Sequence, residues 1–277
     1  MFTILIPTWN NLEYLQLCID SIVKNSKWKH QILIHINDGM DGTLDWVQSQ
    51  GYQYTHSEQN IGICKAVNGL AIWADKDYIV YMNDDMYTCP DWDTHLAEAI
   101  QSVRTNCFML SATMIEPNDT GNPCVVVKDF GRDIENFQET MLLKSYNQDD
   151  HQDWSGSAWP PTVVHRNYWH LVGGYSIEFS PGMSSDDDFA KKMWEAGCRI
   201  FRGIAKSKVY HFQTKSTGRI VKNDGRRQFL MKWGMNQSTF NRLYLRRGEK
   251  YKGPLEEPDK RTVDRELLRA RWKIRLM

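Results

Sequence analysis

The run Phe2-Thr3-Ile4-Leu5-Ile6-Pro7 is continuously apolar up to its proline, apart from one threonine. Such a run is typical of a strand that is buried on both faces of a parallel sheet. Apolar residues then recur at helical spacing between residues 12 and 24, and a second apolar run covers residues 31–36. A strand, a helix and a strand in this order predict a parallel β-α-β unit and therefore an α/β fold.

The same alternation continues to about residue 100 and indicates an open sheet with helices on both faces. Ligands of such sheets bind beyond the carboxyl ends of the strands, and the polar clusters of this chain fall there. Residues 116–162 mix Gly, Pro, Asn and Asp without a period, so we expect loops. The remaining strands are expected at 52–55, 78–82, 108–115, 199–204 and 209–212, and the remaining helices at 43–50, 63–74, 187–196, 226–233 and 263–274.

The composition is that of a folded globular chain. Of 277 residues, 41% are hydrophobic and 25% charged, which favours one catalytic-size domain with an appendage. Apolar runs fall short of the roughly 18 to 20 residues of a membrane span, and the apolar opening lacks the cationic lead of a signal peptide. We therefore expect a soluble, cytoplasmic protein. The cysteines show no C-x-x-C pair and no zinc spacing, so we expect reduced, buried thiols.

The C-terminal part is basic in an otherwise balanced chain. The whole chain has 34 basic and 34 acidic residues, whereas residues 241–277 hold 12 basic and 6 acidic ones. Three interpretations stay open for a helical extension over residues 236–277: a solvated appendage, a peripheral contact with an anionic membrane at the inner face, and a nucleic-acid contact. The last is not favoured, because no nucleic-acid recognition motif accompanies the charge.

Asn83-Asp84-Asp85 directly follows the predicted strand at residues 78–82. Adjacent carboxylates at the end of a buried strand repel each other unless a cation or a donor-rich ligand lies beside them. A hard divalent metal is the natural partner. The alternative is a polar exit from the strand, since Asn and Asp favour turns.

Asp186-Asp187-Asp188 opens the predicted helix at residues 187–196. Acids at a helix N-terminus cap it and stabilise its dipole, which explains the cluster without chemistry. One of the three could instead be a general base for a hydroxyl group. His211 lies alone in the apolar strand at residues 209–212, where a histidine is usually a satisfied core residue and less often a ligand.

Taken in order, the motifs of residues 3–215 resemble family 2 glycosyltransferases, which have the GT-A nucleotide-sugar fold. The resemblance implies a Rossmann-like open mixed sheet, mainly parallel, in a domain at residues 1–235, with a nucleotide-binding half at 1–105 and an acceptor half at 106–235. The motifs that carry it are Ile6-Pro7-Thr8-Trp9-Asn10, Asn37-Asp38-Gly39, Asp41-Gly42-Thr43, Asn60-x-Gly62, Ala66-x-Asn68-x-Gly69, Asn83-Asp84-Asp85, Gly173-Gly174-Tyr175, the acids before Phe189, and Tyr210-His211.

The resemblance also implies roles for single residues. The donor nucleotide would be bound by Pro7, Thr8, Trp9, Asp38, Lys65, Asn68, Asn83 and Asp84. The metal, Mn²⁺ or Mg²⁺, would be held by Asp85 and His211. The base would be Asp186 or, less favoured, Asp187, with Asp188 as the later acid of the motif, and Gly182 and Met183 would lie over the sugar. Two departures are Asn83 at the first acid of the D-x-D motif and Ser185 where Glu is common.

The implied activity is a metal-dependent, inverting transfer of sugar from a nucleotide-diphosphate donor, with UDP-sugars favoured. The acceptor would be a hydroxyl group of a glycan or lipid-linked saccharide, as in cell-surface polysaccharide synthesis. Trp154 and Trp159 would line the sugar or acceptor pocket, although core packing explains either ring equally well. The rival hypotheses are a non-catalytic nucleotide-sugar-binding module and, less favoured, a transferase acting on modified DNA.

Overall fold

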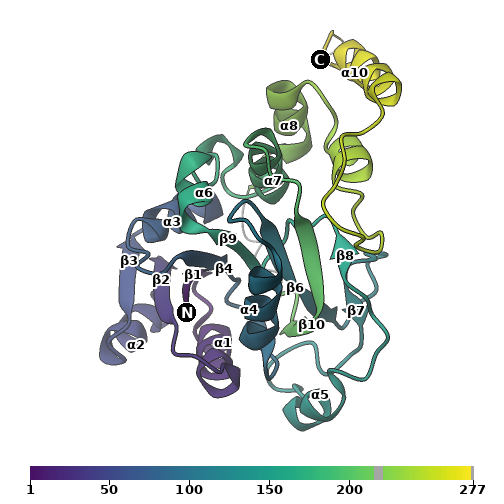
Figure 1. The fold of residues 1–277 in the computed structure, drawn as a ribbon. Coiled ribbons are helices and arrows are strands. Elements are labelled where there is room, and N and C mark those ends of the chain that lie inside the picture. The colour runs from purple at the N-terminus through teal and green to yellow at the C-terminus, as the bar shows by residue number, and fades with distance from the viewer. Residues whose placement is uncertain (215–220, 276–277) are drawn as a thin grey trace.

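A mixed sheet forms the centre of the computed structural model, which describes residues 1–214 and 221–275 (Figure 1). Within these residues the sheet is 10-stranded, and its main order is β3-β2-β1-β4-β9-β6-β10-β5, with β7 beside β6 and β8 beside β10. The strands are β1 Phe2–Trp9, β2 Gln31–Asn37, β3 Gln53–Ser57, β4 Tyr78–Tyr81, β5 Met86–Thr88, β6 Met109–Glu116, β7 Val126–Val127, β8 Trp154–Ser155, β9 Thr162–His165 and β10 Phe201–His211.

The N-terminal half of the sheet is parallel, because β1 pairs in parallel with both β2 and β4, and β2 with β3. Antiparallel pairs enter with β9, which lies between β4 and β6, and with β5 and β8 on β10. The α/β fold with an open, mainly parallel mixed sheet is therefore confirmed.

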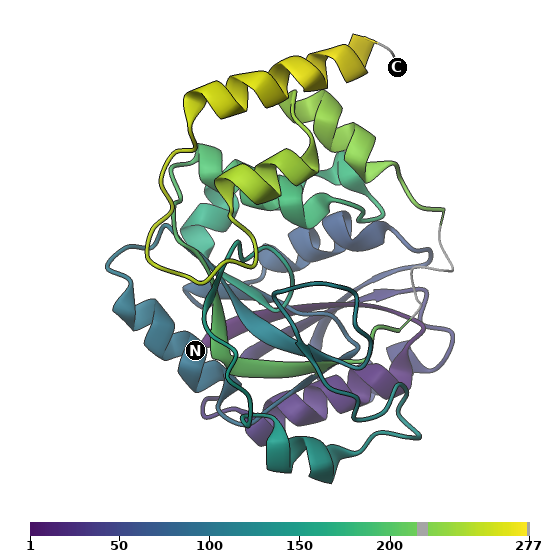
Figure 2. The same ribbon diagram turned by 90° about the vertical axis from the view of Figure 1, so that its right-hand side faces the viewer.

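Helices cover both faces of the sheet (Figure 2). Along β1, Leu5 points to one core and Ile4 and Ile6 point to the other, as the two-residue period of a strand requires. The described helices are α1 Leu12–Asn25, α2 Thr43–Ser49, α3 Gly62–Ala71, α4 Trp92–Ser102, α5 Glu139–Ser145, α6 Arg166–Leu171, α7 Ser185–Glu195, α8 Gly225–Trp233, α9 Gln237–Thr239 and α10 Lys260–Arg275, with short turns of other helix types at η1 Ile177–Phe179 and η3 Phe240–Tyr244.

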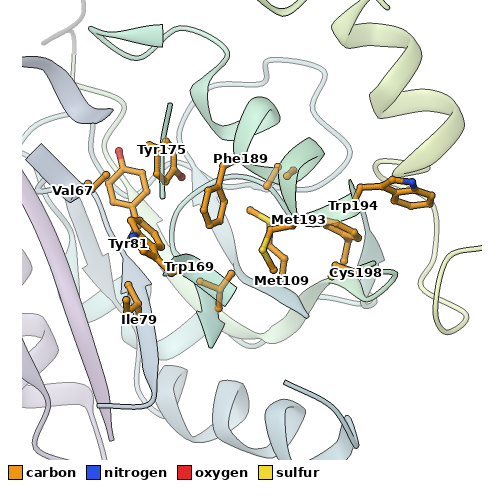
Figure 3. Close-up of a cluster of buried hydrophobic side chains, with 14 of the residues drawn as sticks. Val67, Ile79, Tyr81, Met109, Trp169, Tyr175, Phe189, Met193, Trp194 and Cys198 are labelled. Carbon is orange, nitrogen blue, oxygen red and sulfur yellow. The ribbon is translucent and has the colours of Figure 1, made fainter. Parts of the chain in front are cut away.

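One core is rich in aromatic side chains and supports the later site (Figure 3). Tyr175 stacks on Phe189 of α7 with ring centroids 4.9 Å apart, and Trp169 of α6 packs on both rings. Because these aromatic pairs are buried, they fix α7 against the loop that follows α6.

Two parts of the sequence-based prediction were wrong. The strands expected at 199–204 and 209–212 are one strand, β10, whose pairing with β6 shifts register between Ile204 and Lys208. This register shift coincides with the polar and charged residues that interrupt the apolar pattern of the strand between Ile204 and Lys208. The stretch expected to consist of loops contains α5 and two short strands, and β5, α4, β9 and α6 were not predicted.

The C-terminal segment, residues 225–275, packs on the rest of the fold and contributes to its core. Phe240, Leu245 and Leu255 belong to the same buried cluster as Phe189 of α7. The predicted division of the chain at residues 105 and 235 stays a prediction, and residues 276 and 277 of the extension lie outside the described part. No helix among the described residues is long and apolar enough to cross a membrane.

Candidate active site

A cavity of about 380 Å³ opens at the carboxyl ends of β1 and β4. The residues that follow parallel strands lie at the same edge of the sheet, the edge formed by the carboxyl ends of the strands. Residues that are far apart in the sequence therefore meet at this edge. The walls come from the end of β1, the segment after β4, the loop before α7 and the end of β10. They include Pro7, Thr8, Trp9, Asn37, Asn60, Gly62, Tyr81, Asn83, Asp84, Asp85, Pro181, Met183, His211, Gln213 and Thr214.

Asp85 and His211 meet on one side of this cavity. Oδ1 of Asp85 lies 3.5 Å from Nε2 of His211, and Nδ1 of His211 lies 2.8 Å from Glu116 at the end of β6. The other carboxylate oxygen of Asp85 accepts hydrogen bonds from the backbone N–H and the hydroxyl of Thr214, at 2.8 and 2.9 Å. Glu116 thus orients the imidazole ring so that Nε2 faces Asp85.

The charges in this cluster depend on one another. Burial opposes a charge on His211, but Asp85 and Glu116 outweigh it and raise the pKa of His211 to about 10. Burial likewise opposes a charge on Asp85, and the His211 cation and the Thr214 donors hold its pKa below the usual value. Asp85 and His211 therefore form an ionised pair.

A divalent metal fits the donor set of Asp85 and His211. The carboxylate suits both Mn²⁺ and Mg²⁺, whereas an imidazole backed by a carboxylate is a transition-metal ligand and makes the pair a better fit to Mn²⁺; the remaining positions are open to substrate oxygens. A metal at Nε2 would take the place of the proton. Among residues 1–214 and 221–275 no group of three or more His, Cys, Asp and Glu side chains could hold a metal ion. A metal at Asp85 and His211 would therefore need further ligands from the substrate.

Asp84 lies beside this pair and bonds to β1. Its Oδ2 accepts a 2.7 Å hydrogen bond from the hydroxyl of Thr8. Burial and the adjacent Asp85 raise the pKa of Asp84 to about 7. Thr8 and Asp84 therefore hold the first and fourth strands together at the cavity.

Asp186, in the first turn of α7, lies near enough to Tyr81 of the cavity wall for its charge to add to burial in raising the pKa of that tyrosine. Its Oδ1 accepts a 2.9 Å hydrogen bond from the hydroxyl of Tyr175. Burial raises the pKa of Asp186 to about 7, and the charge of Asp187 adds to the effect, whereas the Tyr175 donor opposes it. A carboxylate that titrates near neutral pH suits a general base.

Asn68, for which a nucleotide contact is predicted, binds the backbone of Tyr175 in the structure. Its amide group accepts a 2.8 Å hydrogen bond from the N–H of Tyr175 and donates one of 2.7 Å to the carbonyl of Tyr175. Gly174 has a φ of +61°, and a Cβ there would lie 2.3 Å from Oδ1 of Asn68. Asn68 thus positions Tyr175, and it is absent from the cavity wall.

Asp187 and Asp188 face the C-terminal segment instead of the cavity. Asp187 is buried and pairs with Arg247 and Gln237. The equally buried Asp188 accepts hydrogen bonds from Trp233, Ser176 and Lys232. The prediction of a catalytic role for these two acids therefore conflicts with their geometry, because their oxygens are already occupied by structural partners.

Two predicted nucleotide-binding residues lie away from the cavity wall. Asp38 has a φ of +62° and accepts hydrogen bonds from the Asn10 side chain and the Met40 N–H, which makes it a turn residue. Lys65 is exposed on α3. Asn37 and Asn60 occupy the wall in their place.

The tryptophans separate into two kinds. Trp154 is buried, donates a 3.1 Å hydrogen bond to Thr113 and fills the space over Gly203, so it packs in the core, which is the alternative that the sequence leaves equally open for it. Trp159 is half-buried, and the guanidinium of Arg247 lies 4.2 Å from its ring centroid. Of the predicted sugar loop, Met183 lines the cavity and Gly182 packs on Ile63.

Sequence reasoning missed Glu116, Tyr175 and Thr214 as parts of the site. Glu116 could have been found, since it follows the apolar strand of residues 108–115 just as Asp84 follows β4. Tyr175 stood in a recognised Gly-Gly-Tyr motif without a role. Thr214 gives no signal in the sequence.

The family assignment follows from a sequence profile. The profile of "Glycosyl transferase family 2" matches residues 3–149, which is more than half of the 277-residue chain. The chain belongs to glycosyl transferase family 2. The matched region contains β1 and the Asn83-Asp84-Asp85 motif but ends before α7. No curated protein sequence shows significant similarity to the chain.

Solved structures of S. aureus TarS share the fold. The structure of TarS 1-349 superposes with a TM-score of 0.56 at 14% identity, over 76% of this chain and 60% of that one. The structures in complex with UDP and with UDP-GlcNAc also give TM-scores of 0.56, at 13% and 14% identity, over 76% of this chain and 59% and 57% of theirs. The chain thus spans about three fifths of TarS 1-349, and the likeness establishes the GT-A fold of this family.

Proposed function

We propose that this protein transfers a sugar from a nucleotide-diphosphate donor to a hydroxyl group of a glycan or lipid-linked saccharide. The observation that carries the proposal is the shared cavity in which Trp9, the Asp84-Asp85 pair and His211 meet. Its volume of about 380 Å³ lies in the range of small-molecule sites. The Trp9 ring offers a stacking surface for a base, and the Asn60 amide nitrogen offers donors beside it.

A UDP-sugar is the donor that we favour. TarS, which shares the fold, has been solved with UDP and with UDP-GlcNAc. Asn83 occupies the position of the first acid of the family motif. This position would therefore contact the donor nucleotide through an uncharged amide. The hydrogen bond from Thr8 to Asp84 connects the part of the cavity beside Trp9, proposed for the nucleotide base, with the part beside Asp85, proposed for the metal.

Asp85 and His211 would hold Mn²⁺ or Mg²⁺ together with the donor diphosphate. When bound, the metal would neutralise the charge that develops on the departing diphosphate. Two protein ligands hold a divalent ion weakly, so donor and metal should bind cooperatively.

Asp186 would remove the proton of the acceptor hydroxyl as that oxygen attacks the anomeric carbon. One in-line displacement inverts this carbon, so we propose an inverting enzyme. Tyr175 and Asn68 are positioning residues, because they act on the substrate through Asp186.

A thermal-shift screen tests the donor site. UDP-, GDP- and dTDP-sugars are added with and without Mn²⁺ to the wild type and to Asp85→Ala. A stabilisation that needs both donor and metal and vanishes in the variant supports the site. Turnover then separates the two functional classes: release of the nucleoside diphosphate indicates a transferase, whereas binding without turnover over varied acceptors indicates a binding module.

A peripheral membrane contact through α10 is the second part of the proposal. Leu268 and Trp272 lie one helical turn apart and are 56% and 65% exposed, on a helix rich in Arg and Lys. Such a surface suits an anionic bilayer. Sedimentation with anionic vesicles should show binding that Trp272→Glu abolishes and that Trp73→Glu, at another exposed tryptophan, leaves intact. Equal binding of all three proteins would exclude the contact.

A further inference from the structure

A second cavity, of about 690 Å³, lies between the loop of residues 120–123 and the C-terminal segment. We call it the arginine groove, because Arg242, Arg246 and Arg247 line it and, within the described part of the chain, Glu249 is its one acidic lining residue. It also contains the half-buried Trp159. Its volume exceeds that of the donor cavity and falls within the range of ligand sites.

The three arginines differ in how their charge is compensated. Arg247 pairs with Asp187 and stacks on Trp159, so its charge is neutralised and its position fixed. Arg242 has a looser pair, 3.6 Å from Glu266. Among the described residues the side chain of Arg246 has no hydrogen-bond or ion-pair partner, although it is partly buried and its backbone has a φ of +47°. Positive charge at Arg242 and Arg246 is therefore available to a ligand.

Neutral polar side chains complete the wall. Thr120, Asn122, Ser238 and Asn241 line the groove, and the buried Oδ1 of Asn241 has no hydrogen-bond partner within the described residues. Hydroxyl and amide groups of this kind bind saccharide hydroxyls, while guanidinium groups bind carboxylates and phosphates in a two-pronged geometry. The lining thus matches a saccharide that carries anionic groups.

The arginine groove adjoins the candidate active site at two points. Asn118 donates a 2.9 Å hydrogen bond to Gln213, which lines the donor cavity, and the loop continues from there to Thr120 in the groove. On the other side Arg247 binds Asp187, the residue after Asp186, and its charge lowers the pKa of Asp186. The groove therefore borders both the donor cavity and the residue next to the candidate base.

We infer that the arginine groove binds the acceptor and that the acceptor is an acidic saccharide bearing carboxylate or phosphate groups. This inference rests on the proposed function, because it assigns the acceptor of the same transfer. Arg242 and Arg246 hold the anionic groups, and the polar residues of the wall hold the hydroxyl groups of neighbouring sugars.

The test compares binding of four probes by fluorescence anisotropy: oligogalacturonate, phosphorylated maltooligosaccharide, neutral maltooligosaccharide and single-stranded DNA of equal charge. The groove variant is Arg242→Gln/Arg246→Asn, since Asn tolerates a positive φ. The control, Arg265→Gln/Arg271→Gln, removes two exposed charges from α10. Unfolding midpoints of both variants are compared with that of the wild type to establish folding.

The wild type should bind at least one acidic oligosaccharide about tenfold or more tightly than the neutral one, as expected for charge-assisted hydrogen bonds. The groove variant should lose this preference while the control keeps it. Comparison of the two acidic probes identifies carboxylate or phosphate as the preferred group. If the groove variant does not fold, the wild type alone provides the test: added salt must weaken its binding of the acidic oligosaccharides and leave its binding of the neutral oligosaccharide unchanged.

Three results would overturn the inference: equal binding of acidic and neutral probes, equal loss of binding in the groove and control variants, or tighter binding of DNA than of either acidic saccharide. A donor- and metal-dependent thermal shift in a protein that fails these tests would leave the proposed transferase standing. Acidic binding without any donor shift would instead overturn the transferase and, with it, the acceptor role of the groove.

Discussion

The hydroxyl group of Tyr175 donates a 2.9 Å hydrogen bond to Oδ1 of Asp186. Tyr175 is itself held by the Asn68 amide at its backbone and by Phe189 at its ring. The candidate base is thus fixed by a chain of contacts that starts on α3 and crosses the loop before η1. A donor to the carboxylate stabilises its charged form, against the burial that raises its pKa.

Replacing Asp186 by Asn should reduce transfer by a factor of about 10² to 10⁴, the usual contribution of a general base. Donor binding should survive, because Asp186 does not line the donor cavity. Turnover with an acceptor and the thermal shift with donor and Mn²⁺ measure the two effects. Transfer near the wild-type rate in this variant would exclude Asp186 as the base.

The rate should depend on pH through Asp186. Its pKa of about 7 means that the active carboxylate form grows as pH rises through 7, so kcat/KM should increase over that interval and then level off. In Tyr175→Phe the lost donor raises the pKa further, and the rise should move to higher pH by about 0.5 to 1 unit. An unchanged profile in the Phe variant would mean that another group sets it.

Asn68→Ala separates positioning from nucleotide binding. If Asn68 acts through Tyr175, the variant should lower kcat by about tenfold and leave the KM for the donor within a factor of two. Steady-state kinetics at varied donor concentration provides the measurement. A large rise in donor KM with kcat preserved would favour the nucleotide contact that the sequence predicts.

Removal of the metal should remove donor binding. Treatment with EDTA should abolish the donor-induced thermal shift, and added Mn²⁺ should restore it in the wild type but not in His211→Ala. His56→Ala is a suitable control, because His56 is exposed and bonds to a backbone carbonyl outside the donor cavity. A full donor shift in EDTA would contradict the proposed metal site.

Asp187→Ala should destabilise the fold more than it affects the chemistry. Breaking a buried ion pair leaves Arg247 uncompensated and costs about 3 to 5 kcal/mol. The pair of half-buried Arg199 and exposed Glu257 offers the comparison, since Glu257→Ala should cost less than about 1 kcal/mol. Urea unfolding of the two variants tests the difference, and equal midpoints would show that the Asp187 contact contributes little.

The sequence was most informative where one local pattern dominates. The apolar run at Phe2–Pro7 and the helical periods after it predicted β1, α1 and β2, because burial on both faces leaves few other structures for such residues. β9 escaped detection since its pairing with β4 and β6 is non-local and its four residues show no period. The single strand β10 was split in the prediction because its polar middle looks like a loop.

For the candidate site, the sequence located the strand ends but not the partners of each side chain. Asp85 and His211, 126 positions apart, lie together at the predicted edge. The three acids of α7 could not be told apart, because Asp187 and Asp188 bind residues of the C-terminal segment that no local pattern connects to them. The displacement of Asp38 from the cavity likewise depends on turn geometry, and that of Lys65 on its place on the exposed face of α3.

The division of work within Asp186-Asp187-Asp188 has an evolutionary consequence. Asp187 and Asp188 should change in step with Arg247 and Trp233 when related sequences are compared, since each depends on its own partner. Asp186 should be retained even in relatives that have lost or replaced the C-terminal segment. The three adjacent acids would then be conserved for two different reasons: Asp186 for catalysis, and Asp187 and Asp188 for packing against the C-terminal segment.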